Sequence, residues 1–142
     1  GDASNSVTNN LGLLNIAATA VANAGSYAYA SASVDTAISQ DATASDGGNA
    51  SNLVDNLGTL NISALAVANG GTYASASAEV DTGIDQSATA YGGGNASNVV
   101  SNGAGTLNIG ALAVANAGAT GTAYAWASIS SAISQSARLS WV

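Results

Sequence analysis

The stretch from Tyr73 to Tyr91 alternates between two kinds of residue. One series holds almost all of its aliphatic side chains, and every acidic residue of the stretch falls in the other series. A period of two residues is typical of an extended strand with one buried face and one wet face, whereas a helix repeats about every 3.6 residues. The spacing therefore predicts a long β-strand, although alanine by itself favours helix.

The same alternation occurs three times, within a longer internal repeat of 46 to 49 residues. The repeats cover approximately residues 2–47, 48–93 and 94–142, and a Leu-Asn-Ile triplet opens the same strand in each, at Leu14, Leu60 and Leu107. Repeats that cannot bury their apolar face alone stack on their neighbours. The sequence therefore predicts an all-β fold, a β-solenoid that forms a single domain over residues 1–142.

Each repeat also shows a weaker internal division. The run from Leu60 to Ala66, followed by Asn69-Gly70-Gly71, resembles the run from Ile84 to Ala90, followed by Gly92-Gly93-Gly94. Glycine and asparagine accept the positive φ values that tight corners need. This offset favours two coils of 22–24 residues in each repeat. One larger, three- or four-sided coil per repeat is the alternative, and both versions place each repeat over its equivalent.

Stacking would bring equivalent amide side chains into files. In-register amides bond to each other along a stack, as they do in cross-β assemblies. We expect three such ladders, two of them (the glutamines and the first asparagine set) on the inward-facing series. The ladder residues are Gln40, Gln86 and Gln135; Asn15, Asn61 and Asn108; and Asn23, Asn69 and Asn116.

The strands that begin near Leu14, Leu60 and Leu107 carry apolar residues on both faces. The second face includes Val21 and Leu65. Strands that are apolar on both faces are usually covered on both sides. We therefore expect a neighbour on the outer face of these strands, either a loop of the same chain or another molecule.

The composition excludes several functions. The net charge is −7, Arg138 is the only basic residue, and Lys, His and Cys are absent. Ser–His, Cys–His and lysine nucleophiles are therefore excluded within one chain. Such an acidic chain cannot neutralise phosphates, so nucleic acids and anionic membranes are not expected partners, and no segment is apolar enough to span a bilayer. We expect no enzyme activity, small-molecule substrate or cofactor.

Calcium is the one metal that the sequence leaves open. Asp35 and Asp81 occupy equivalent positions in the first two repeats, so stacking would bring their carboxylates together. Calcium prefers oxygen ligands of this kind. Two solvated acidic side chains are the simpler interpretation.

The ends of the repeat array bear on assembly. Proline and lysine, which natural sheets use to blunt exposed edges, are both absent. The first repeat begins near residue 2, and the third departs from the pattern only over residues 138–142, without a charged or helical cap. We therefore expect copies to add end to end. Three aromatic residues crowd the last repeat as a candidate joint: Tyr124, Trp126 and Trp141.

One motif carries a family resemblance. The segment from Gln86 to Asn98 reads QSATAYGGGNASN, and residues 40–52 form its twin. In its spaced Gln, Gly and Gly-Asn residues, the segment resembles curlin-type and related bacterial functional-amyloid subunits, although it lacks their second Gln. The resemblance implies a secreted matrix fibre. A chain that begins at Gly1 without Met fits either a processed secreted protein or a trimmed sequence.

These features together predict a structural subunit of a secreted, self-assembling extracellular filament, of the biofilm or cell-surface kind, whose main partner is itself. The alternative is a monomeric β-solenoid binding module, either an adhesin segment or an ice-binding protein. The scattered threonines argue against a regular ice-binding array. Donor-strand exchange, in which an end strand completes the neighbour's sheet, is a third mode of assembly.

Overall fold

The computed structural model describes residues 1–141, and its nine elements are all β-strands. Chain reversals and corners of two to five residues separate them. The strands are β1 (Ala3–Asn9), β2 (Leu13–Ala24), β3 (Tyr27–Ala44), β4 (Ala50–Asn56), β5 (Thr59–Gly70), β6 (Tyr73–Tyr91), β7 (Ala96–Ser101), β8 (Thr106–Ala117) and β9 (Thr122–Ser140).

The strands form three parallel sheets of three strands each. We call β1-β4-β7 the short sheet, β2-β5-β8 the middle sheet and β3-β6-β9 the long sheet. Every strand pairs with the strand three places away in the chain, so β1–β3, β4–β6 and β7–β9 make a first, second and third layer. The all-β prediction is confirmed, and parallel strands in three sheets are consistent with a β-solenoid.

The pairing contradicts the expected two coils of 22–24 residues per repeat. Paired residues are 46 to 49 positions apart, as in Asn61 with Asn15 and Gln135 with Gln86. The similarity at about 24 residues reflects the shared alternation of the middle and long sheets, whose strands lie opposite each other and do not pair. The strands pair where their side chains match at nearly every position, as in Leu60 over Leu14.

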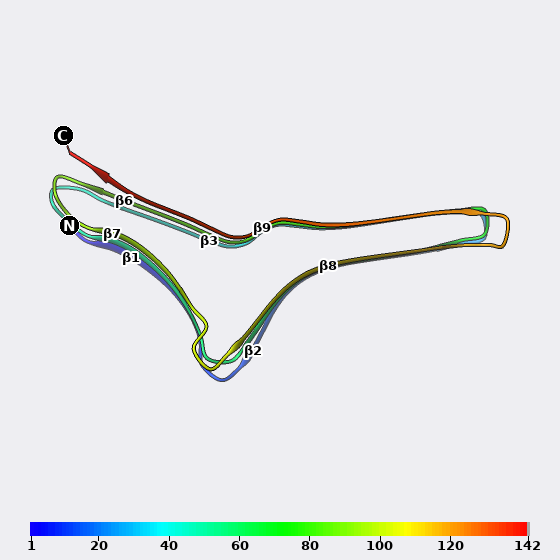
Figure 1. The fold of residues 1–142 in the computed structure, drawn as a ribbon, viewed down its shortest axis with the longest axis horizontal. Coiled ribbons are helices and arrows are strands. Elements are labelled where there is room, and N and C mark those ends of the chain that lie inside the picture. The colour runs from blue at the N-terminus through cyan, green and yellow to red at the C-terminus, as the bar shows by residue number, and fades with distance from the viewer. Residues whose placement is uncertain (142) are drawn as a thin grey trace.

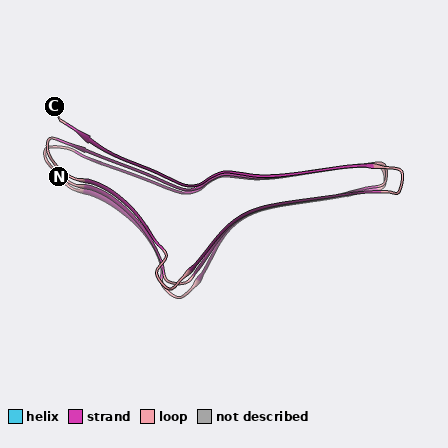
Figure 2. Cartoon of the chain, in the orientation of Figure 1, coloured by secondary structure: helices cyan, strands magenta, loops and turns pink. Residues whose placement is uncertain are grey.

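The outline of the molecule is long, thin and bent (Figure 1). From the N-terminus the chain follows β1 to a corner, turns along β2 to the far end, and returns along the whole length as β3. The three layers overlie one another when viewed down the shortest axis, so the stacking direction is the shortest dimension. Loops are confined to the corners and ends of this outline (Figure 2).

The core is thin because it is built mainly from alanine. Alanines of the long sheet pack against alanines of the middle sheet in one arm, and a second alanine cluster lies between the long and short sheets. Larger buried side chains gather where the three sheets meet, among them Leu60, Ile62 and Ile84. Small residues on both sides let two sheets approach closely, which explains the narrow arms.

The inward alternation of the long sheet is interrupted at its bend. Thr82 is half-buried and Thr36 is exposed, whereas Gly83 turns inward toward Ile109 of the middle sheet. The uninterrupted alternation predicted for residues 73–91, and for the equivalent stretch of the first repeat, is therefore wrong at this point. The interruption occurs where the long sheet stops covering the middle sheet and begins to cover the short one.

Candidate functional site

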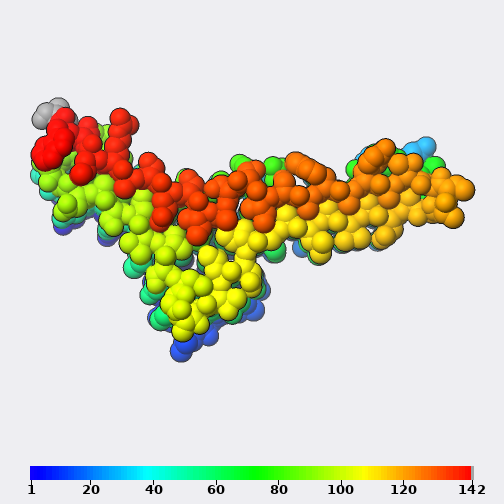
Figure 3. Space-filling model, viewed as in Figure 1, coloured from blue at the N-terminus to red at the C-terminus, as the bar shows by residue number. Residues whose placement is uncertain are grey.

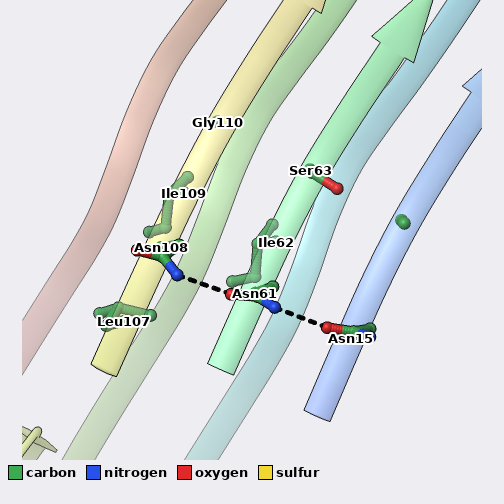
Figure 4. Close-up of a pocket in the computed structure, with 9 residues that line it drawn as sticks. Asn15, Asn61, Ile62, Ser63, Leu107, Asn108, Ile109 and Gly110 are labelled. Carbon is green, nitrogen blue, oxygen red and sulfur yellow. Dashed lines mark hydrogen bonds between the residues drawn. The ribbon is translucent and has the colours of Figure 1, made fainter. Parts of the chain in front are cut away.

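Two of the predicted amide ladders run across the outer face of the middle sheet. Asn61 donates from Nδ2 to Oδ1 of Asn15 at 2.8 Å, and Asn108 donates in the same way to Asn61 at 2.7 Å (Figure 4). The second ladder repeats this geometry at 2.8 Å in each step, from Asn116 to Asn69 and from Asn69 to Asn23. The expected inward direction of the Asn15 set is wrong, because these amides share a face with the wet series.

A shallow groove of about 600 Å³ lies beside the first ladder. Its lining combines the ladder asparagines with small residues such as Ser63 and Gly110 (Figure 4). The other lining residues are Ala17, Ile62, Leu107 and Ile109. Farther along the same face, Val21 and Leu112 are exposed. Nothing among the described residues covers this outer face, so the expected cover by a loop of the same chain is not found there.

The third predicted ladder is buried. Gln86 donates to Gln40 and Gln135 donates to Gln86, each from Nε2 to Oε1 at 2.7 Å. Gln86 is 0 % exposed, and its Nε2 also donates to the carbonyl oxygen of Val99 at 3.1 Å. Gln40 bonds to the carbonyl oxygen of Leu53 at 3.0 Å. The glutamines therefore tie the long sheet to the short sheet of the next layer.

Two further ladders lie on the inward face of the short sheet. Asn5 donates to Asn52 at 3.0 Å, Asn52 donates to Asn98 at 2.9 Å, and Asn52 also bonds to the carbonyl oxygen of Ser87 at 2.7 Å. The other ladder joins Asn9, Asn56 and Asn102 at 2.8 and 2.6 Å. These asparagines recur at equivalent positions of the three repeats, but ladders were not predicted for them because they lie close to expected corners.

The two outer layers expose complete strand edges. In the part of the chain that the structure describes, β1–β3 and β7–β9 each have one paired neighbour and one open side. Figure 3 looks onto the third layer, whose strands run across the whole visible face. The third layer also exposes inward-series side chains. Ile129 and Ile133 are 43 % and 42 % exposed, whereas their second-layer equivalents Val80 and Ile84 are 0 % exposed.

The three predicted joint aromatics do not form one cluster. Tyr124 lies near the start of β9, on a tyrosine file in which its ring centroid is 5.7 Å from that of Tyr73. Trp126 is exposed on the same strand, two residues farther along. Trp141 lies beyond the other end of β9, near Gly93. The 19-residue length of β9 separates these two positions, so a single joint built from all three residues is ruled out within one copy.

Asp35 and Asp81 lie in adjacent layers on the outer face of the long sheet. Their neighbours pair directly, Val34 with Val80 and Thr36 with Thr82, and both aspartates are exposed. Ser33 donates a hydrogen bond to Asp35 at 3.0 Å. No group of three or more acidic, His or Cys side chains that could hold a metal ion occurs among residues 1–141. Calcium normally takes six to eight oxygen ligands, and this pair supplies two side chains.

No family model matches the chain, and neither curated proteins nor solved structures give a match. Over the described residues, no helix is long and apolar enough to cross a membrane. The amide ladders and the two open faces are therefore the features of the chain that bear on its function.

Proposed function

We propose that the chain is the structural subunit of a secreted, extracellular filament, whose copies stack through the open edges of their outer layers. In this proposal each repeat is one three-sided coil of a β-solenoid, and a neighbouring copy supplies the next coil. The function is mechanical and involves no catalysis or cofactor. A biofilm or cell-surface fibre is the setting that such a subunit would suit.

The observation that carries the proposal is the pair of open faces. Each face presents three parallel strands with unpaired backbone groups, and the longest of them, β3 and β9, have 18 and 19 residues. Open edges of this length, without proline or lysine to blunt them, are templates for pairing with another chain. The amide ladders strengthen the same contact, since each reaches both faces and can continue across a joint.

A monomeric binding module is the second candidate function, and one feature favours it. Tyr27, Tyr29, Tyr73 and Tyr124 gather on the outer face of the long sheet, with ring centroids 5.3 to 6.2 Å apart. Exposed aromatic surfaces of this kind often mark a binding site. Ice binding is less well supported, because it would need a regular array of threonines. Thr106 pairs with Thr59, but the equivalent residue of the first layer is Leu13.

Electron microscopy and sedimentation velocity of the purified 142-residue chain test the proposal. Unbranched filaments should form as the protein concentration rises at neutral pH, and aligned filaments should give a reflection near ~4.8 Å from the strand spacing. Monodisperse monomers at high concentration would contradict the filament and favour the binding module.

A further inference from the structure

We infer that assembly is strictly head to tail. The first layer of one copy binds the third layer of a second copy, in the register that already relates the layers within one molecule. This inference rests on the proposed function and specifies its interface. Four independent features of the two faces support it: ladder polarity, charge, exposed apolar side chains and glycine packing.

Each ladder is a file of N–H···O bonds, so it has a donor end and an acceptor end. In the Asn15, Asn23 and Gln40 ladders, every bond donates toward the first layer, which leaves amide nitrogens at the first face and oxygens at the third. The Asn5 and Asn9 ladders run the opposite way. Head-to-tail stacking matches a donor to an acceptor in all five ladders, whereas head-to-head stacking continues none of them, because a copy that is turned over does not place its ladders over those of the other.

Charge is divided unequally between the two faces. The first repeat carries four acidic residues, the second carries another four, and the third carries none while holding Arg138. Extending the register places Ser136 over Asp41 of the second copy, with Arg138 diagonally across from the same carboxylate. Contact between two first layers would instead bring eight acidic side chains to one joint, where like charges repel.

The apolar side chains also fit the head-to-tail register. Ile129 and Ile133, which are partly exposed in the third layer, would lie over Val34 and Ile38 of the second copy. Tyr124 would lie over Tyr29 of that copy and so extend the tyrosine file across the joint. The partial exposure of these side chains in one copy is removed by the stacking that buries their second-layer equivalents.

The glycine corners provide a joint-specific probe. A Cβ at Gly71 would overlap the carbonyl oxygen of Gly25 in the layer before it, and a Cβ at Gly118 would overlap that of Gly71. A Cβ at Gly25 meets nothing within 4 Å, and Gly25 lies outside the left-handed region of φ. In a head-to-tail stack, however, Gly25 would face Gly118 of the second copy. Gly25→Val should therefore be tolerated in a single copy and excluded from the joint.

Two variants that each block one face test the inference. Gly25→Val blocks the first face, and Ile133→Asp places a carboxylate that is partly exposed in one copy but buried in a joint. Gly110→Ala is the control, because a Cβ there also meets nothing within 4 Å and its file continues with Ser63 and Ala17. Sedimentation velocity and electron microscopy measure assembly, and circular dichroism checks that each variant keeps its sheet content.

Head-to-tail stacking predicts a specific pattern of assembly among these variants. Each blocked variant alone should remain monomeric at concentrations roughly 10- to 100-fold above the wild-type threshold, as overpacking of a closed contact predicts. An equimolar mixture should form dimers and no filaments, because one free first face meets one free third face. The Gly110→Ala variant should assemble like the wild type.

The failures are distinguishable. A wild-type chain that never assembles overturns the proposed function together with the inference. Wild-type filaments combined with single-blocked variants that dimerise on their own would show head-to-head contact and overturn the inference alone. Unchanged filament formation by Gly25→Val would also overturn it. If Ile133→Asp loses its sheet content, Ser136→Asp on the exposed outer face serves as a weaker third-face variant, which should raise the threshold for filament growth by about 2- to 5-fold at low ionic strength. No change in that threshold would then overturn the inference.

Discussion

The amide residues make different contributions on the two faces of the sheets. The Asn61 amide bonds along an exposed ladder, where water can replace a lost partner. The Gln86 amide is fully buried and bonds to three groups, Gln40, Gln135 and the carbonyl of Val99. Leaving a buried polar group without a partner is much costlier than removing an exposed hydrogen bond. The buried ladder should therefore dominate fold stability.

We predict that Gln86→Ala lowers the free energy of unfolding by about 3 to 5 kcal/mol, since it strands buried amide and carbonyl groups and opens a cavity. Asn61→Ala should cost about 0.5 to 1 kcal/mol, because its partners stay hydrated. Denaturant unfolding in the Gly25→Val background measures both without interference from assembly. Equal losses in the two variants would mean that burial does not determine how much a ladder contributes to the free energy of unfolding.

At this scale much of the site could be predicted from sequence. The identity and spacing of the amide residues indicated which of them stack on one another, and the hydrogen bonds of all three ladders form. Their direction was harder to predict, because Asn15 sits on a strand with apolar residues on both faces. The Asn5 and Asn9 ladders were missed because the short strands around them offer too few alternations to separate a strand from a corner.

At the scale of elements, the edge strand β9 decides how copies meet. Its outer face carries serines at the positions that would meet the first layer of a second copy, so the joint escapes direct contact between acids. Ser136 lies over Ser87 within the molecule and over Asp41 of the second copy. Ser134 lies over Asp85 within the molecule and over Ser39 of the second copy. An acidic residue placed at position 136 would therefore meet an acid only at the joint, whereas one placed at position 134 would meet an acid inside the same copy.

We predict that Ser136→Asp raises the concentration needed for filament growth by about 2- to 5-fold at low ionic strength, from like-charge pairing across the joint. Salt should reverse the effect, because the screening length falls to about 3 Å near 1 M. Ser134→Asp is the matched control and should shift that concentration by less than about 2-fold. Turbidity or pelleting at two salt concentrations provides the measurement. A larger effect from Ser134→Asp than from Ser136→Asp would mean that the copies meet in a different register from the one proposed.

Strand positions followed from the two-residue period, but strand pairing did not. Alternating alanine strands fit any other alternating alanine strand, so the pattern alone left two coil lengths open. The matching side chains at 46 to 49 residues, such as Gln86 over Gln40, distinguish the true partners from the weaker echo at about 24. Ladder chemistry is therefore a better guide to register than hydrophobic alternation in a chain this rich in alanine.

The whole molecule has a bent outline (Figure 1), and the strand pairing makes it only three layers deep. This shape depends on where alanine pairs give way to Leu60, Ile62 and Ile84, and on the interruption near Gly83. No periodic signal in the sequence encodes that bend, since it arises from packing among three sheets. An outline with three unequal sides also favours head-to-tail stacking, because turning one copy over would not superpose its strand edges on those of the other copy.

The axial rise of the filament, measured by cryo-electron microscopy, tests the central claim most directly. If each copy adds three strand layers in unbroken register, the rise per copy is about 14 Å, three times the strand spacing, with all strands lying across the filament axis. A rise unrelated to three strand spacings, or strands running along the axis, would contradict the account.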